Sequence, residues 1–248
     1  MRDIAAPAPM SSPMNAFDST ILDAVNTCCR HATVFYKALV FLSDSHLLKG
    51  GVLALLFWWA WFRPAARTPL YQERLLATLV GCVVAIVLAR ALAYGLPFRV
   101  RPLHDPALGW IVPDGIAADN MEAWSSFPSD HAVLFFAWST GLWWASRTAG
   151  VIALCHATLL ICVPRLFLGV HYPTDLLAGA AMGVAVAIAC NLWLARQRWV
   201  AAMAALSRTR PQWFYPALFF FTYQAADLFD DCRAILHAVA KLAHVGTM

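Results

Sequence analysis

Two histidines of this chain stand close in sequence to arginines and to a carboxylate, beside long apolar stretches. Pro128–His131 reads P-S-D-H, and Arg165, His171 and Asp175 follow in the spacing R-x5-H-x3-D. Arg101-Pro102 forms a third group upstream. Charged and imidazole groups are costly at membrane depth unless partners or a function retain them. Two arginines, two histidines and one carboxylate are the groups needed to transfer a phosphoryl group through a histidine.

Each histidine suits a different step. His171 offers a neutral ring nitrogen that can attack phosphorus near neutral pH. Asp175 follows it by four residues, so a helix that begins near Tyr172-Pro173 brings the carboxylate close to the imidazole. The carboxylate would then hold one ring nitrogen as N–H and leave the other free to attack. His131 is the expected donor of a proton to the leaving group.

Three further side chains are expected to bind the phosphoryl oxygens. Arg101 and Arg165 present planar forks of N–H donors to the charge that must be held as bonds rearrange. Ser129 adds a hydroxyl, and the backbone N–H groups near the start of the following helix favour an anion. This scheme requires no metal ion and no cofactor.

The composition is that of an integral membrane protein. Of the 248 residues, 61% are hydrophobic and only 13% charged, and the mean hydropathy is +0.62. Such values lie outside the range of soluble domains. The net charge of +4 is small and dispersed over loops, so it indicates membrane topology and not a nucleic-acid surface.

We therefore predict an all-α bundle of about five or six transmembrane helices, preceded by an amphipathic interfacial helix within Asn15–Ser45. Residues 1–46 would form the tail and interfacial helix, 47–196 the membrane core, and 197–248 a basic segment with an apolar or interfacial helix. The expected spans are Leu47–Phe62, Leu75–Leu96, Ala132–Ser146, Val151–Val170 and Leu176–Ala195, with Trp213–Leu228 as a short span or an interfacial helix.

The arginines of the loops predict the orientation. Short loops rich in lysine and arginine stay cytoplasmic. With five spans, one side of the membrane receives Arg63, Arg67, Arg74, Arg147, Arg196, Arg198, Arg208 and Arg210. All three motifs then lie on the other side, which would be the periplasmic face of a bacterial inner membrane. The loop Pro97–Pro128 is long enough for a functional lid or binding loop on that face.

The order R-P, P-S-x-H and R-x5-H-x3-D at the ends of successive spans resembles the type-2 phosphatidic acid phosphatase superfamily, over roughly Arg90 to Asp175. P-S-D-H looks like the branch of bacterial enzymes that act on undecaprenyl diphosphate. The resemblance implies a lipid phosphatase in which His171 forms a phosphohistidine that water cleaves, with His131 as proton donor. Undecaprenyl diphosphate comes first as substrate, ahead of phosphatidic acid and phosphatidylglycerol phosphate.

The first motif departs from the family pattern K-x6-R-P, because Tyr94 stands where the lysine is usual. Arg99 or Arg90 could supply the missing cation, and Arg99 is favoured because it shares the loop with Arg101. Asp130 replaces the usual glycine of the second motif. A carboxylate there would repel phosphate, so we expect it to contact Arg99 or to tune His131. Tyr94 is a second residue that could tune the site.

Other interpretations stay open. The same fold could pass the phosphoryl group to another lipid, as a phosphotransferase. Intramembrane polar residues also occur along transport paths, so a non-catalytic transporter or scaffold is a further possibility. The sequence does not determine the oligomeric state. We expect a structural, hydrogen-bonded or interfacial role for His31, His46, His104, His156, His237 and His244.

Overall fold

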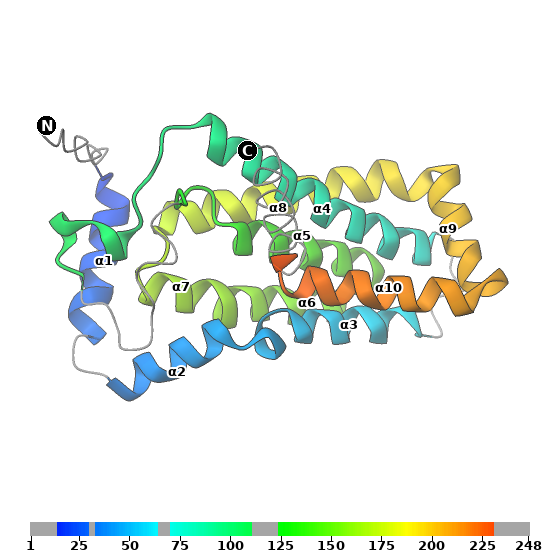
Figure 1. Cartoon of the computed structure of the whole chain (residues 1–248), viewed down its shortest axis with the longest axis horizontal. Coiled ribbons are helices and arrows are strands. Elements are labelled where there is room, and N and C mark those ends of the chain that lie inside the picture. The colour runs from blue at the N-terminus through cyan, green and yellow to red at the C-terminus, as the bar shows by residue number, and fades with distance from the viewer. Residues whose placement is uncertain (1–13, 30–32, 64–69, 111–123, 231–248) are drawn as a thin grey trace, which may run out of the picture.

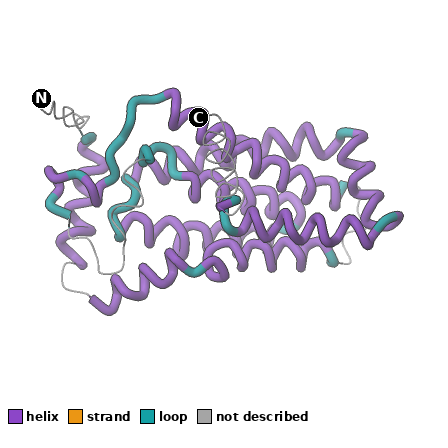
Figure 2. Tube along the Cα trace, in the orientation of Figure 1, coloured by secondary structure: helices purple, strands orange, loops and turns teal. Residues whose placement is uncertain are grey.

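The computed structural model describes residues 14–29, 33–63, 70–110 and 124–230, and within these ranges it is helical with no strand (Figures 1 and 2). The prediction of an all-α fold is confirmed. The α-helices are α1 (Ala16–Cys29), α2 (Thr33–Asp44), α3 (Val52–Trp61), α4 (Tyr71–Gly95), α5 (Asp130–Ala145), α6 (Arg147–His156), α7 (Val163–Phe167), α8 (Pro173–Trp193), α9 (Arg198–Thr209) and α10 (Pro211–Ala226). Two π-helical turns, η1 (Leu47–Gly51) and η6 (Ala157–Cys162), continue into α3 and α7.

Helix α5 is the centre of the bundle and packs against α4, α6 and α8. Its side chains Val133, Phe135 and Trp138 are completely buried. Glycines of α8 let the α5 backbone approach closely, because a Cβ atom on Gly183 would lie 2.2 Å from the carbonyl oxygen of Val133. Small residues at such contacts are typical of helix pairs in membranes. The close packing fixes the starts of α5 and α8 relative to each other, and both starts carry site residues.

Within the described residues, three helices are long and apolar enough to cross a membrane: Tyr71–Gly95, Arg147–Phe167 and Pro173–Arg196. A fourth span results if Val34–Asp44 and Leu47–Trp61, which meet at an angle of 70°, are one broken span. Helix α5, expected as a span, and helix α10, expected as a short span or an interfacial helix, have 16 residues each. Sixteen residues reach about 24 Å, short of a typical hydrocarbon core. The predicted count of five or six spans therefore stays a prediction.

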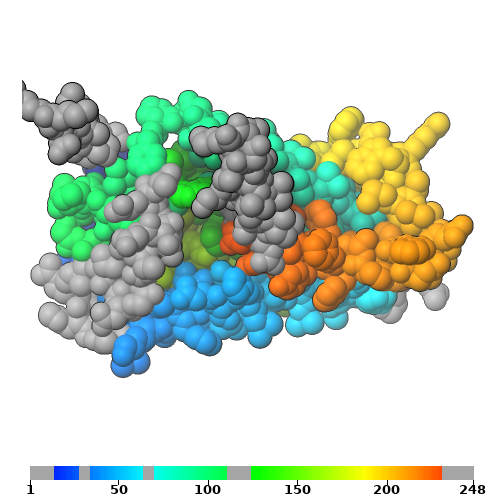
Figure 3. All heavy atoms as spheres, in the orientation of Figure 1, coloured from blue at the N-terminus to red at the C-terminus, as the bar shows by residue number. Residues whose placement is uncertain are grey.

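Large apolar side chains cover the outside of the bundle as well as its interior. Leu55 of α3, Val87 of α4, Leu177 of α8 and Phe219 of α10 are each about 60% exposed or more. Figure 3 shows one such surface, where α10 lies along α3. Apolar side chains exposed on every outer helix suit contact with lipid tails and not with water.

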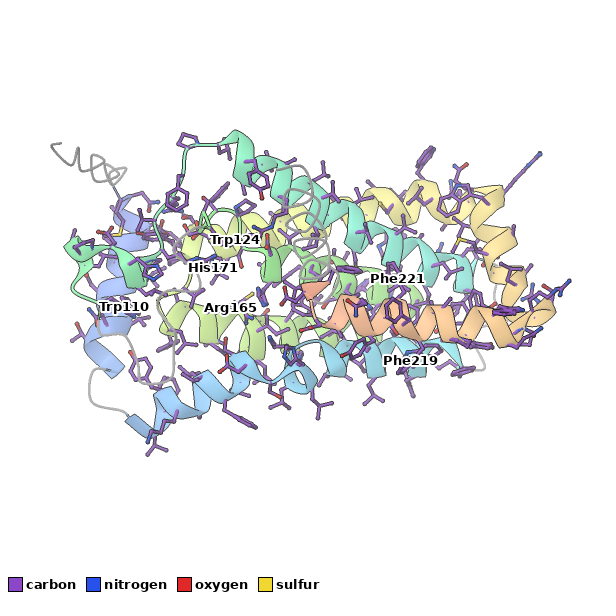
Figure 4. The ribbon with its side chains drawn as sticks, in the orientation of Figure 1. Trp110, Trp124, Arg165, His171, Phe219 and Phe221 are labelled. Atoms are coloured by element: carbon purple, nitrogen blue, oxygen red, sulfur yellow. The ribbon has the colours of Figure 1, made fainter. Side chains whose placement is uncertain are left out.

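The described loop arginines gather at one end of the bundle, and Arg67 lies outside the described residues. Arg63 donates to the Ser146 hydroxyl at 2.7 Å, and the Arg74 guanidinium stacks over Trp144 at 5.5 Å. In Figure 1 this is the end with α9, while α1 crosses the opposite end. The three motifs lie at the α1 end (Figure 4). The separation of motifs from arginine-rich loops that the sequence predicts is present in the fold.

The N-terminal segment differs from the single amphipathic helix that we expected within Asn15–Ser45. Two helices form, α1 and α2, and α1 packs against α7 and α8. The fully buried Asp18 carboxylate accepts hydrogen bonds from the backbone N–H of Thr174 at 2.9 Å, from its hydroxyl at 2.6 Å, and from Arg99 at 2.7 Å. Because α1 buries this charge against the core, α1 is part of the bundle.

We expect Asp18→Asn to destabilise the protein, because an amide cannot replace the charge that Arg99 faces. Breaking a buried ion pair from one side costs on the order of 3 kcal/mol. Thermal unfolding in detergent measures the loss, with Asp23→Asn as the control because Asp23 is exposed on the same helix. Equal unfolding temperatures for the two variants would contradict the role given to Asp18.

Candidate active site

A cavity of about 420 Å³ opens at the motif end of the bundle. Residues from widely separated segments line it, which is why no single motif describes it. Figure 4 shows Trp124, Arg165 and His171 close together at this end. The lining comprises Ser43, Asp44, Lys49, Arg90, Arg101, Trp124, Ser125, Pro128, Asp130, His131, Arg165, Val170, His171, Leu228 and Asp230.

The contacts of His171 determine which ring nitrogen carries its proton. Nδ1 lies 2.9 Å from the carbonyl oxygen of Ser126, and a carbonyl can only accept, so Nδ1 bears the hydrogen. Nε2 lies 3.4 Å from Nη1 of Arg101, and a guanidinium can only donate, so Nε2 presents a lone pair. Both contacts require the same tautomer. The nitrogen free to react is Nε2.

Burial keeps this imidazole neutral. His171 is 4% exposed, and removal from water lowers its pKa to about 4, with the charges of Arg101 and Arg165 acting in the same direction and Asp175 opposing them. Arg101 is also buried, which lowers the pKa of its guanidinium to about 10 and still leaves it protonated at neutral pH. A neutral nitrogen therefore sits beside a permanent cation.

Helix α8 begins at Pro173 with Tyr172 as its N-cap, as the sequence predicts. Asp175 is fully buried in the first turn, where its Oδ2 accepts from the backbone N–H of Tyr172 at 2.9 Å. The same oxygen is 3.7 Å from Nδ1 of His171, beyond hydrogen-bond length. The Ser126 carbonyl, and not the carboxylate, is thus the hydrogen-bond partner of Nδ1, while Asp175 supplies a negative charge nearby.

Arg99 lies behind the cavity and does not line it. Its guanidinium pairs with both Asp18 and Asp175 and donates to the Thr174 hydroxyl at 2.9 Å. It also stacks over the ring of Tyr172 at 4.0 Å. With these partners Arg99 orients the carboxylate near His171, whereas we expected it to bind phosphate.

The two arginines expected to bind phosphate both line the cavity. Arg165 is 3% exposed, and its Nη1 donates to the carbonyl oxygen of Ile161 at 2.8 Å. Arg101 donates to the carbonyl oxygen of Val170 at 3.0 Å. Each guanidinium has five N–H donors, so these single bonds fix its position and leave other N–H groups for an anion.

The start of α5 differs in part from our expectation. Ser129 is fully buried and caps α5, its hydroxyl accepting from the backbone N–H of Ala132 at 3.5 Å, and it does not line the cavity. Asp130 pairs with Arg90 of α4, so the expected contact with Arg99 is wrong. The Arg90 guanidinium also stacks over Trp124 at 4.7 Å. This pairing draws the Asp130 charge toward α4.

His131 and Tyr94 have different surroundings. His131 is partly buried and lines the cavity, with its ring centroid 6.1 Å from that of Phe135. Tyr94 is 83% exposed near the end of α4 and is not part of the cavity lining, so the tuning role suggested for it has no contact to support it.

Sequence reasoning missed several residues of the site. Asp44 is the last residue of α2, Lys49 lies in η1 between α2 and α3, and Asp230 follows α10. Lys49 has one signal in the sequence, because it is a lysine inside an apolar run that begins at Leu47. Ser126 contributes through its backbone carbonyl, which no side-chain motif can reveal.

A phosphoryl group fits this arrangement chemically. Four cationic side chains and three carboxylates line the cavity, together with the two histidines. Within the described residues, no group of three or more histidine, cysteine or acidic side chains is placed to hold a metal ion. The parts present are a neutral nucleophile, a second imidazole able to move a proton, and guanidinium groups able to hold developing negative charge.

Comparison with known proteins agrees with the motifs. Residues 96–199 match the PAP2 superfamily. The chain is similar to the bacitracin transport permease protein BcrC of Bacillus licheniformis, with 39% identity over 64 residues, which are 26% of this chain and 31% of that protein. No solved structure matches the chain.

The matched segment includes Arg101, His131, Arg165 and His171, the cavity residues that the motifs predict. The apolar helices described above supply the membrane-embedded setting. The chain is therefore an integral membrane protein in which residues 96–199 match the PAP2 superfamily.

Proposed function

We propose that this protein is a lipid phosphatase that hydrolyses the phosphate or diphosphate head of a membrane lipid through a phosphohistidine at His171. Undecaprenyl diphosphate is the favoured substrate, because P-S-D-H at Pro128–His131 resembles the enzymes that act on it. The observation that carries the proposal is the neutral Nε2 of His171, held beside buried Arg101 and in the same cavity as buried Arg165.

The reaction follows in two steps. Nε2 of His171 forms a bond to phosphorus while the bond to the leaving oxygen breaks, and the electron pair stays on that oxygen. His131 donates the proton that the leaving oxygen needs. Water then attacks the phosphohistidine and gives a proton to His131, the N–P bond breaks, and inorganic phosphate and the neutral imidazole are released. Arg101 and Arg165 hold the phosphoryl oxygens in both steps.

The charge on the imidazole explains the place of Asp175. Phosphorylated at Nε2 and protonated at Nδ1, the ring carries positive charge that the free ring lacks. A carboxylate 3.7 Å from Nδ1 stabilises this charge without being its hydrogen-bond partner. Arg99 and the N–H of Tyr172 hold the carboxylate in position.

A lipid substrate suits the surroundings of the cavity. The cavity lies at one end of a bundle whose outer surface is apolar, which is the level at which lipid headgroups meet a membrane-embedded protein. Transfer of the phosphoryl group to a second lipid would use the same first step. The name of the relative BcrC describes bacitracin transport, and a transport role for this chain would need no phosphohistidine.

Trapping of the intermediate tests the proposal. Phosphohistidine is hydrolysed in acid and survives in alkali, so we expect alkali-stable, acid-labile label on the wild-type protein after brief exposure to lipid carrying ³²P in its terminal phosphate. His171→Ala should carry no such label and should lose activity by at least about a thousandfold.

His104→Ala is the matched control, since His104 lies in the same loop as Arg101 but outside the cavity lining. Phosphatase activity of His171→Ala at the wild-type rate would refute the assignment. Release of phosphate without an added acceptor lipid distinguishes hydrolysis from transfer.

The pH dependence of catalysis should reflect the low pKa of His171. Because the neutral form attacks and the pKa is about 4, we expect kcat/KM to fall only as the pH drops toward 4 and not through 6.5. The profile is measured with both a lipid diphosphate and a lipid monophosphate. A limb that arises from titration of the substrate shifts between the two substrates, whereas a limb that arises from His171 stays at the same pH. An acidic limb near 6.5 for both substrates would contradict the buried, neutral histidine.

The orientation follows from the arginines at the α9 end. We propose that the cavity faces the periplasm of a bacterial inner membrane. A cysteine at Ala107, close to the motif loop, should react with an impermeant thiol reagent added to intact spheroplasts, whereas one at Arg208 should react only after lysis. The variants are made in a background without the seven native cysteines. The reverse labelling pattern would place the cavity on the cytoplasmic side.

A further inference from the structure

Lys49 brings a cation to the cavity from outside the motifs. It lies in the π-helical turn η1, is 8% exposed, and lines the cavity together with Arg101 and Arg165. The residues 96–199 that match the PAP2 superfamily do not include it. A buried lysine among apolar segments is retained only where partners or a ligand compensate for its charge.

The backbone around Lys49 is held from two sides. Nε2 of His156, buried on α6, lies 3.1 Å from the Lys49 carbonyl oxygen. On the other side, a Cβ atom on Gly50 would lie 2.0 Å from the carbonyl oxygen of Ala226, so α10 ends directly against this turn. π-helical turns of this kind are frequent at functional sites. The lysine is positioned by packing from α6 and α10 and not by a flexible loop.

The charge neighbours of Lys49 locate it within the cavity. Its charge interacts with those of His131 and Arg165. The charges that act most on His171 are instead those of Arg101, Asp175 and Arg165. Arg101 contacts Nε2 of His171 directly, whereas Lys49 reaches the same cavity from η1.

Attacking and leaving atoms lie roughly in line through phosphorus. A phosphoryl group attacked by His171 therefore directs its leaving group away from His171, and we expect His131 and Lys49, which line the same cavity, to face that leaving group. For a lipid monophosphate the leaving group is an alkoxide. For a lipid diphosphate it is a second phosphate, whose negative charge a lysine ammonium can bind.

We propose that Lys49 binds the leaving phosphate of a lipid diphosphate and so makes the protein selective for diphosphate over monophosphate headgroups. This inference rests on the phosphatase function proposed above. Asp44 and Asp230 line the same cavity and face Lys49 with opposite charge. If Lys49 served only to neutralise them, its loss would affect stability and both substrates alike.

The test compares farnesyl diphosphate with farnesyl phosphate, which share one tail and differ only in the headgroup. For Lys49→Met we expect kcat/KM to fall at least about tenfold more for the diphosphate than for the monophosphate. Lys49→Arg should keep most of the preference, because it retains the charge. Lys37→Met is the matched control, since Lys37 is exposed on α2, and it should behave as wild type.

Equal losses on the two substrates, or none, would overturn the role of Lys49 while leaving the phosphatase intact. Hydrolysis of neither substrate by the wild type would instead refute the proposed function itself. A measurement on the wild-type protein guards against variants that do not fold. A bridging methylene diphosphonate with a farnesyl tail should protect Lys49 from acylation, as read by mass spectrometry, and the matching monophosphonate should not. Equal protection by both would also overturn the assignment.

Discussion

The hydrogen bond from Nδ1 of His171 to the carbonyl oxygen of Ser126 is the interaction on which the rest of the site depends. It determines the tautomer, and with it the nitrogen that can react. To form it, the loop that ends at Ser126 must lie against the turn between α7 and α8. That contact is supported by the backbone N–H of Ser126, which donates to the Arg99 carbonyl at 2.9 Å, and by the N–H of Ser129, which donates to the Asp175 carbonyl at 3.2 Å. Two segments far apart in sequence are thus joined at the nucleophile.

Around this bond the charges are arranged in two layers. Arg101, Arg165 and Lys49 line the cavity and can contact an anion. Asp18 and Arg99 lie behind it and hold Asp175 from the side away from the cavity. Fully buried charges are stable only when each has a partner. The residues that line the cavity thus supply positive charge to the substrate, and the residues behind it orient the imidazole.

Both layers include residues that precede the segment shared with the PAP2 superfamily. Asp18 comes from α1 and Lys49 from η1, whereas the superfamily match begins at residue 96. The N-terminal helices therefore complete the site as well as contacting the bundle. The helix that ends in Asp227 also contributes, since the α10 terminus packs against η1 and the residues after it line the cavity.

Patterns in the sequence predicted the features that depend on local chemistry. Apolar runs predicted the helical bundle, and Pro173 after Tyr172 predicted the start of α8. Motif spacing and loop arginines predicted that Arg101, His131, Arg165 and His171 would meet at one end.

The features that depend on tertiary contacts could not be predicted from the sequence. Arg90 and Arg99 are both arginines close to the first motif, and only packing decides that one pairs with Asp130 and the other with Asp18 and Asp175. The partner of His171 Nδ1 is a backbone carbonyl, and every residue has one.

The tautomer of His171 is the central claim, and nitrogen-15 NMR of the histidine-labelled protein in detergent measures it directly. The His171 signals are those that disappear in His171→Gln. At pH 7 we expect a neutral ring with hydrogen on Nδ1 and an unprotonated Nε2. A ring protonated at Nε2, whether as the other tautomer or as the imidazolium, would contradict it.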